Sequence, residues 1–358
     1  MTFEDVLEIK NGRNQRAVEN PEGKYPIYGS GGIMGYADHY ICDAQTVIVG
    51  RKGSINNPLY VEEPFWNVDT AFGLCANRAI LLPRYLYYFC KRFDFERLNK
   101  AVTIPSLTKS DLLKIEIDLP RLEEQQEVVN QLIKTEQIIE LRKKELEELD
   151  NLIKSRFVEM FGDMTVNPNG WEVVNLGKVC DVRDGTHDSP KYFTEGYPLV
   201  TSKNVTSGKI DFSDCSLICE EDYKKINERS KVDFGDILMP MIGTVGKPVI
   251  VDVDAEFAIK NVALIKFYDD SQVTNIFVKA LLQSDYFDRA VISKIRGGTQ
   301  KFIALGDIRK LEICLPPMLI QEEFATFIEQ VDKLKFEVQK SLDETQILMD
   351  SLMQQYFG

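Results

Sequence analysis

The stretch that decides the fold is Asp111–Glu127, DLLKIEIDLPRLEEQQE, because the chain repeats it as Asp307–Glu323, DIRKLEICLPPMLIQEE. Both copies hold an Asp, a Lys, a Glu-Ile pair, a Leu-Pro pair, a Gln and a Glu at the same positions. When the comparison is extended, residues 103–162 align with residues 299–358 without a gap, and 16 of the 60 positions are identical. Chance would leave only a few identities, so the chain is predicted to be an internal duplication.

Each copy predicts a short strand followed by a long helix. The strands are expected at Ile115–Leu119 and Leu311–Leu315, and a proline stops each one. From Leu122 to Met160 the chain has neither Gly nor Pro. A helix of this length would be roughly 58 Å long at 1.5 Å per residue, well beyond the usual globular helix.

Apolar residues recur every seven residues along both predicted helices, which is the spacing of a coiled coil. In an ordinary helix such a stripe usually packs inside one domain. The length, the repetition and the acidic outer faces instead favour a coiled coil between modules, in which the two helices pack on each other. The residues expected in this packing are Leu132, Ile139, Leu146, Ile153, Ile328, Val338, Leu342 and Met349.

The helices, residues 121–162 and 317–358, alternate with two modules, residues 1–120 and 163–316. The modules are richer in Gly, Pro, Thr and β-branched residues, with short apolar runs such as Thr46–Val49 and Phe257–Ile259, so both are predicted to be mixed α/β domains.

The two modules share a sparse skeleton of turn residues. Asn11-Gly12 recurs as Asp184-Gly185, Tyr25-Pro26 as Tyr197-Pro198, and Gly53-Ser54 as Gly243-Thr244. The residues around the skeleton differ, which suits two modules with one fold and different ligands.

Composition describes a globular protein large enough for two cores. Hydrophobic residues make up 44% and charged residues 28% of the 358 positions, and no apolar run approaches the roughly 18 residues of a membrane span. The seven cysteines are scattered and form no Cys-x-x-Cys pair, so neither a disulfide framework nor a zinc site is indicated. The N-terminus lacks the pattern of an export signal. We therefore expect a cytoplasmic protein that does not associate with membranes.

The net charge of −13 argues at first against nucleic acid, because phosphate binding normally requires a basic surface. Residues 121–162 carry −3 and residues 317–358 carry −5, so the two helices hold −8 of the total. The modules are close to neutral. Most of the acidity therefore lies on segments that need not touch DNA.

Polar loops in the modules are the places where DNA contacts are expected. Arg and Lys can bind guanine, Asn and Gln can bind adenine, and glycine lets backbone N–H groups approach phosphate. Each position taken alone would also suit an ordinary surface turn. The candidates are Lys10, Asn11, Arg13, Arg51, Lys52 and Ser54 in the first module, and Arg183, Thr186, His187, Lys203, Asn204, Lys260, Asn261, Arg296, Gln300 and Lys301 in the second.

Catalytic motifs are not found in the sequence. An adenine methyltransferase would show an Asn-Pro-Pro-Tyr type loop and a glycine-rich donor turn, but Asn57-Pro58-Leu59-Tyr60 lacks the second proline. The chain has only two histidines, His39 and His187, which excludes a multi-histidine metal centre. No catalytic, cofactor-binding or metal-binding residues are predicted.

Four segments resemble those of the specificity subunits of type I restriction-modification systems. They are Tyr25–Gly32, Val49–Ser54, Leu119–Gln125 and Asp184–Tyr192, and the order module, helix, module, helix is also that of the family. One departure is that the first module begins at Thr2-Phe3, whereas the second begins with the longer leader Trp171–Gly177.

The resemblance implies two target-recognition domains that each read one half of a split, asymmetric site in double-stranded DNA. The two helices would pack antiparallel as a spacer and dock two methyltransferase subunits. It also implies that S-adenosylmethionine, ATP and Mg²⁺ are bound by partner subunits, including a motor-nuclease, and that this chain binds no cofactor.

The sequence also fits two other functions. A coiled-coil scaffold whose modules bind protein would fit the overall acidity, and DNA retention would distinguish it. A diverged DNA-modifying enzyme would be revealed by activity of the purified chain with Mg²⁺ or S-adenosylmethionine.

Overall fold

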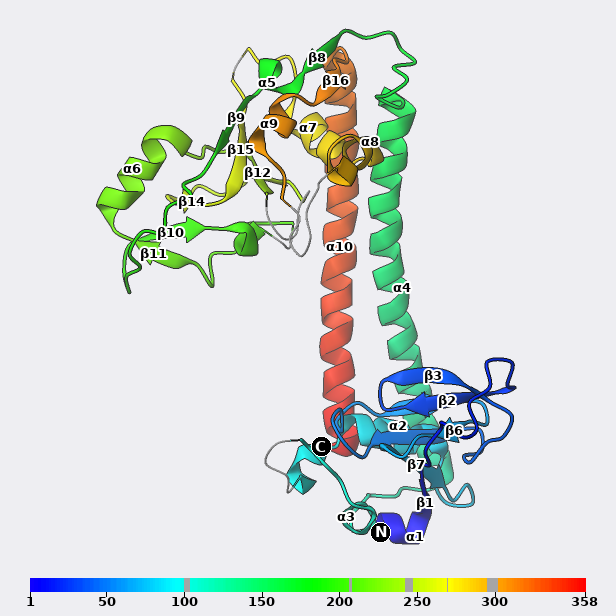
Figure 1. Cartoon of the computed structure of the whole chain (residues 1–358). Helices are drawn as coiled ribbons and strands as arrows, with labels where there is room; N and C mark the ends of the chain where they lie inside the picture. Colours follow the sequence, from blue (N-terminus) through cyan, green and yellow to red (C-terminus); the bar gives the residue numbers. More distant parts are fainter. Residues whose placement is uncertain (100–103, 206–207, 242–246, 269, 295–301) are drawn as a thin grey trace. The chain divides into compact units, whose positions relative to one another are not determined.

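The computed structural model describes residues 1–99, 104–205, 208–241, 247–268, 270–294 and 302–358. Contacts divide the chain into two compact units (Figure 1). Unit 1 comprises residues 1–145 and 338–358, and unit 2 comprises residues 146–337. Each long helix, α4 (Leu122–Phe161) and α10 (Met318–Phe357), contributes one part to each unit.

Unit 1 contains a large antiparallel sheet with strand order β1-β7-β4-β5, and a small sheet with order β3-β2-β6. Strand β4 is buried along its whole length, because every residue of its sequence TVIVG faces packed side chains. The strands are β1 (Leu7–Asn11), β2 (Tyr25–Gly29), β3 (Gly32–Ala37), β4 (Thr46–Gly50), β5 (Leu59–Val61), β6 (Trp66–Asn67) and β7 (Ala71–Ala76). The short helices are α1 (Phe3–Val6), α2 (Pro83–Arg92), η1 (Phe95–Leu98) and α3 (Lys109–Leu112).

Unit 2 contains a large antiparallel sheet with order β9-β15-β12-β13, a small sheet with order β11-β10-β14, and the pair β16-β8. The strands are β8 (Val173–Asn175), β9 (Asp181–Asp184), β10 (Tyr197–Val200), β11 (Ser216–Ile218), β12 (Ile237–Pro240), β13 (Val249–Ile250), β14 (Ala258–Ile259), β15 (Val262–Lys266) and β16 (Glu312–Cys314). The helices are α5 (Leu176–Val179), η2 (Ser202–Val205), α6 (Glu220–Ser230), α7 (Asn275–Leu282), α8 (Asp285–Ala290), η3 (Ile292–Lys294) and α9 (Leu305–Arg309).

The two units repeat one topology in their large sheets and in their three-stranded sheets. β1, β7, β4 and β5 correspond in order and direction to β9, β15, β12 and β13. In the small sheets, β2 is antiparallel to β3 and parallel to β6, and β10 is antiparallel to β11 and parallel to β14. The duplication that the sequence predicts is therefore a duplication of fold, and both modules are mixed α/β as expected.

One predicted strand is wrong. Only Glu116 of Ile115–Leu119 makes a β-bridge, to Thr2, although the matching segment in unit 2 forms the ladder of β16 with β8. The cause is the partner segment. The N–H of Phe3 donates to the carbonyl of Ile115 at 2.9 Å, and helix α1 then begins, so the paired segment is too short for a ladder.

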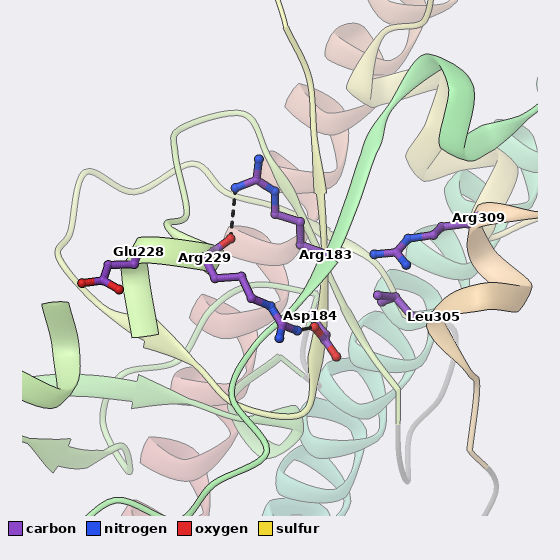
Figure 2. Close-up of a pocket in the computed structure, with 6 residues that line it drawn as sticks. All are labelled: Arg183, Asp184, Glu228, Arg229, Leu305 and Arg309. Atoms are coloured by element: carbon purple, nitrogen blue, oxygen red, sulfur yellow. Dashed lines mark hydrogen bonds and ion pairs between the residues drawn. The ribbon is translucent and has the colours of Figure 1, made fainter. Parts of the chain in front are cut away.

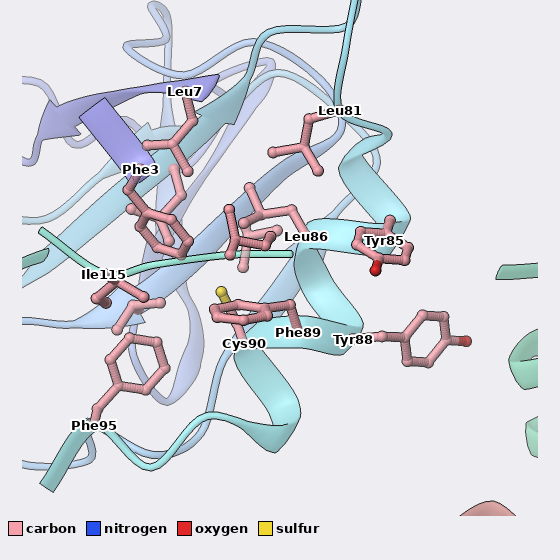
Figure 3. Close-up of a cluster of buried hydrophobic side chains, with 14 of the residues drawn as sticks. Phe3, Leu7, Leu81, Tyr85, Leu86, Tyr88, Phe89, Cys90, Phe95 and Ile115 are labelled. Carbon is pink, nitrogen blue, oxygen red and sulfur yellow. The ribbon is translucent and has the colours of Figure 1, made fainter. Parts of the chain in front are cut away.

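The core of unit 1 lies between the large sheet and helix α2 (Figure 3). Phe3, Leu86 and Phe95 are fully buried there, and the ring of Phe89 lies 5.6 Å from that of Phe3. Both long helices complete this core, α4 with Leu132 and α10 with Met349.

The core of unit 2 is also closed by both long helices. An aromatic cluster joins Phe157 and Phe161 of α4 to Phe324 of α10 and Phe277 of α7, with ring centroids 4.9–5.9 Å apart. Burial of such rings away from water is the main stabilising contribution to a core of this kind.

Contacts inside each unit show that the long helices are antiparallel. In unit 1, Tyr356 donates to the side chain of Gln131 at 2.7 Å. In unit 2, Lys335 pairs with Asp150 at 2.6 Å. As the residue number rises along α4 it falls along α10, so the helices pair in opposite directions.

The residues expected between the helices differ in burial. Leu132, Ile139, Val338 and Met349 are buried, and Leu146, Ile153, Ile328 and Leu342 are half-buried.

A buried glutamine anchors the start of each long helix. Gln125 is completely buried, and its Oε1 accepts from the N–H of Leu82 at 2.9 Å, while its Nε2 donates to the carbonyls of Ile80 and Pro120 at 2.8 Å. Leu82 is the residue before helix α2. The amide therefore joins the first turn of α4 to the start of the helix that covers the sheet.

Gln321, at the matching position of the repeat, makes the same three bonds. Its Oε1 accepts from the N–H of Thr274 at 2.8 Å, and its Nε2 donates to the carbonyls of Gln272 and Pro316 at 3.0 and 2.9 Å. Thr274 precedes helix α7. The glutamine is thus part of the repeat because it satisfies three backbone groups that the fold buries.

We predict that Gln125→Leu lowers the free energy of unfolding by at least about 2 kcal/mol, since each unpaired buried polar group costs about 1 to 3 kcal/mol. Urea denaturation followed by tryptophan fluorescence measures the change. The exposed neighbour Gln126, whose side chain donates to Asn130 of the same helix, provides the control. Gln126→Leu should stay within about 0.5 kcal/mol of the native chain. Equal losses in the two variants would contradict the role given to Gln125.

Candidate nucleic-acid interface

In unit 1, two candidate loops leave the large sheet at the same end. Asn11, the last residue of β1, lies opposite Phe72, and Gly50, the last residue of β4, lies opposite Ala71. Both strands are antiparallel to β7, which lies between them, so residues 11–16 and 51–57 emerge side by side at the start of β7. We call these two segments the strand-end loops of unit 1.

Backbone hydrogen bonds fix these loops to the turn between β6 and β7. The N–H of Arg13 donates to the carbonyl of Asn67 at 2.8 Å, and the N–H of Arg51 donates to that of Thr70 at 2.7 Å. The corresponding loop of unit 2 is fixed in the same way, since the N–H of Thr186 donates to the carbonyl of Ile259 at 3.0 Å. The scaffold under the loop that follows β1 in unit 1 and β9 in unit 2 is therefore the same in the two modules.

The glycine shared by these loops is required by a close backbone approach. A Cβ on Gly12 would lie 1.7 Å from the carbonyl oxygen of Val68, and a Cβ on Gly185 would lie 2.2 Å from that of Ile259. Any side chain at either position would push the loop off the sheet.

Most first-module candidates project from the strand-end loops. Asn11, Arg13, Lys52 and Ser54 are exposed, and the guanidinium of exposed Arg51 lies 5.7 Å from the centre of the Phe72 ring. Arginine over an aromatic ring keeps its N–H edge available to a ligand. The structure therefore brings together five of the six residues predicted for this module.

Lys10 is placed differently. It lies within β1, and its ammonium pairs with Asp43 at 2.9 Å, which raises the pKa of Lys10. A partner that neutralises its charge makes Lys10 a structural residue in this conformation.

In unit 2, His187 lies at the centre of a polar cluster. Its Nε2 is 2.9 Å from a carboxylate oxygen of Asp184, and its Nδ1 is 2.8 Å from the side-chain oxygen of Asn261. Thr186 forms a β-bridge with Lys260, and the ammonium of Lys260 donates to the hydroxyl of Ser189 at 2.6 Å. Four predicted residues thus lie together at the end of β9.

Arg183 and Asn204 have structural surroundings. Arg183 pairs with Asp181, whose pKa is held below its usual value by that guanidinium. The amide of Asn204 is buried and occupied at both ends, because it accepts from Thr201 at 2.9 Å and donates to the carbonyl of Asp211 at 3.1 Å. Asn204 therefore holds its loop and cannot reach a base without unfolding it.

The remaining candidates are Lys203, which is exposed on η2, and Arg296, Gln300 and Lys301, which lie outside the described residues. The predicted recurrence of Gly53-Ser54 as Gly243-Thr244 also lies outside them.

One basic residue near the cluster was not predicted. Arg229, in the last turn of α6, forms an ion pair with Asp184 and lines a hollow of about 650 Å³ together with Arg183, Glu228, Leu305 and Arg309 (Figure 2). The sequence gives no signal for Arg229, because an arginine in a charged helix is normally a solvated surface residue.

Within the described ranges, no three His, Cys, Asp or Glu side chains gather closely enough to hold a metal ion. Among the same residues, no helix has the length and apolar character needed to cross a bilayer.

Fold and loops together define a tandem protein, in which two copies of one α/β module present different side chains on the same scaffold and are joined by paired helices. The sequence profile of the type I restriction modification DNA specificity domain matches residues 1–151 and 168–345. The chain belongs to this family and is a DNA specificity subunit of a type I restriction-modification system.

Similar proteins share this description. The type I restriction enzyme MjaIX specificity subunit of Methanocaldococcus jannaschii is 26% identical over 85% of this chain and 73% of its own length. The EcoBI specificity subunit of Escherichia coli is 20% identical over 94% of this chain and 77% of its own.

Solved structures share the fold. The crystal structure of a type I system S subunit from M. genitalium covers 100% of this chain and 95% of its own, with 17% identity and a TM-score of 0.61. A structure reported on the assembly and conformational transition of a type I system covers 100% and 96%, with 19% identity and a TM-score of 0.62.

Family membership settles the class of activity. The chain is a non-catalytic recognition subunit, and S-adenosylmethionine and ATP are bound by partner subunits rather than by specificity subunits. Membership also implies DNA and the modification and restriction subunits as partners.

We predict that Gly12→Ala destabilises the chain by about 1 to 3 kcal/mol, because the added methyl group overlaps the carbonyl of Val68 and forces the backbone to move. Thermal unfolding measures this loss. Gly31→Ala is the matched control, since its Cβ would meet no atom within 4 Å and its φ is not positive. A Gly12→Ala chain as stable as Gly31→Ala would show that the close approach is not required.

Proposed function

We propose that each module reads one half of a bipartite, asymmetric site in double-stranded DNA. The target-recognition domains in this proposal are residues 1–120 and 163–316, and the helical segments are residues 121–162 and 317–358. The observation that carries the proposal is the pair of equivalent loops, which share a backbone scaffold but carry different side chains. Two modules with the same backbone scaffold can recognise two different DNA sequences while approaching DNA in the same way.

In the first module, the proposed contacts are made by Asn11, Arg13, Arg51, Lys52 and Ser54. Arginine can donate two hydrogen bonds to guanine, and asparagine can pair with adenine in the major groove. Lys52 and Ser54 suit phosphate oxygens, which position the protein without reading sequence. In the second module, His187, Lys203, Lys260 and Asn261 are proposed to act similarly, with Thr186 and the candidates in residues 296–301.

The distribution of charge supports this division. The helical segments carry −8 of the total charge of −13, so the phosphate backbone repels them, whereas the nearly neutral modules let a few exposed cations dominate locally.

We further propose that the paired helices set the spacing between the half-sites and dock two methyltransferase subunits in the cytoplasm, with motor-nuclease subunits joining that complex. Modules on a stiff spacer would engage major grooves about one helical turn, ~34 Å, apart. We propose that Leu132, Ile139, Ile153, Ile328, Val338 and Met349 take part in the helix packing that holds this spacer together.

We predict that replacing Arg51 or Lys52 by Ala alters recognition of one half-site only. A base-reading arginine should cost about 1 to 3 kcal/mol and relax one position, and a phosphate-binding lysine should weaken binding evenly and reduce its salt dependence. Mapping methylated adenines in cells, together with DNA binding at two salt concentrations, distinguishes these results. Lys114→Ala is the control. Lys114 is also exposed, but it lies beside α1 at the start of β1, whereas the strand-end loops lie at the other end of that strand.

If either first-module variant changed bases in both half-sites, the assignment of one module to each half would be wrong. Exchange of residues 1–120 for another module should likewise change one half-site and leave the other as it was.

We predict that Leu146→Asp combined with Leu342→Asp abolishes assembly with a methyltransferase subunit, because burying a charge in an apolar seam costs several kcal/mol. Co-purification and thermal unfolding are the measurements. Leu141→Asp places the same charge on a side chain that is 65% exposed and should leave the unfolding temperature unchanged. Normal assembly of the double variant would rule out this role for the seam.

A further inference from the structure

We propose that Asp184 is a positioning residue of the second module, whose carboxylate holds His187 and Arg229 where both side chains contact DNA. The inference rests on the DNA-reading role proposed above. It adds Arg229 to the contact set and assigns to Asp184 a task that involves no contact with DNA of its own.

The contacts at the end of β9 carry this assignment. One carboxylate oxygen of Asp184 lies 2.9 Å from Nε2 of His187, and the other is ion-paired with a terminal nitrogen of Arg229. Asn261 holds the opposite ring nitrogen of His187 at 2.8 Å. Only 13% of the Asp184 side chain is exposed, against 61% for His187 and 67% for Arg229. A nearly buried anion thus orients two exposed side chains, the imidazole ring of His187 and the guanidinium of Arg229.

Arg229 is brought to this place by its helix. Its backbone carbonyl accepts from the guanidinium of Arg183 at 3.0 Å, which fixes the last turn of α6 against β9. Figure 2 shows the Arg229 side chain directed toward Asp184 at the edge of the hollow. On the opposite wall of this hollow, the guanidinium of Arg309 donates two hydrogen bonds to the carbonyl of Val182, at 2.6 and 3.0 Å. The Arg229 guanidinium, held through one terminal nitrogen, keeps other N–H groups for a ligand.

The equivalent position in the first module lacks this network of contacts. Asn11 occupies the place of Asp184, since each precedes the glycine that approaches the neighbouring backbone. In unit 1, residues 38–45 connect β3 directly to β4, whereas residues 219–236 of unit 2 contain α6. The carboxylate and the helix that supplies Arg229 therefore occur together in the second module.

The ion pair contributes little to folding, because pairs with an exposed partner are weak in water. Its effect lies in preorganisation. An arginine already held in its bound conformation loses less side-chain entropy when it meets DNA.

The test uses the full chain assembled with its modification subunits, and a duplex carrying the site that the native complex methylates in cells. Asp184→Asn places the residue of the first module at this position, so the fold is expected to be kept, and the unfolding temperature checks this. We expect the Kd for this duplex to rise about 5- to 100-fold, and base selection to relax in the second half-site only. Asp184→Glu, which keeps the charge, should recover part of the affinity.

Glu221→Gln is the matched control. It also removes one negative charge, but from the exposed first turn of α6, the helix that carries Arg229. If Asp184 acted only through bulk charge, both neutral variants would bind DNA more tightly, and the proposal would be wrong. The proposal also fails if Asp184→Asn binds and selects as the native chain does.

A double-variant background separates positioning from direct contact. With His187→Ala and Arg229→Ala already present, a further Asp184→Asn change should add nothing, because its effect passes through those two side chains. An additional loss of the same size would overturn the proposal. Relaxed selection in the first half-site as well would instead overturn the one-module, one-half-site function.

Discussion

The buried amide at the first turn of each long helix is the interaction on which the rest of the structure depends. In each unit a proline ends the segment before the long helix, and a shorter helix, α2 or α7, begins nearby. This arrangement leaves backbone N–H and carbonyl groups inside the protein. Gln125 and Gln321 satisfy three such groups each. Because one side chain of the long helix bonds to the backbone just before the shorter helix, the start of the long helix is held against the core of its module.

This constraint explains how the two copies of the module can bind different ligands while keeping one fold. The repeat keeps the residues that join module to helix, and the sheets keep their strand order, while the loop residues beyond Gly12 and Gly185 differ in charge and hydrogen-bonding type. Exposed side chains such as Arg13, Lys52 and His187 vary, whereas the sheets beneath them are kept. Helix α6, which unit 1 lacks between β3 and β4, packs on the small sheet of unit 2 through Tyr223 and Ile226.

The sequence predicted the features that rest on local periodicity. The two helices and the duplication follow from spacing, and the recurrence of Gly12 as Gly185 was predicted, although its cause, a close backbone approach, was seen only in the structure. Features that depend on distant partners were not predictable. The strand at 115–119 lacks its ladder because the partner segment turns into α1, Lys10 is neutralised by Asp43, and Asn204 is buried against Asp211. Arg229 was missed because its importance comes from Asp184, which is far from it in the sequence.

Completion of the first core by residues from the other end of the chain has a consequence for how the protein is made. Met349 and Met353 of α10 are buried in a core that otherwise consists of residues 3–139. A ribosome that has released residues 1–145 has therefore delivered only part of that core, and its apolar surface stays open while the second module is synthesised. Unit 2, whose residues 146–337 are continuous, needs no such later segment to complete its core. Unit 1 is therefore completed only when residues 338–358 join the core that begins with Phe3.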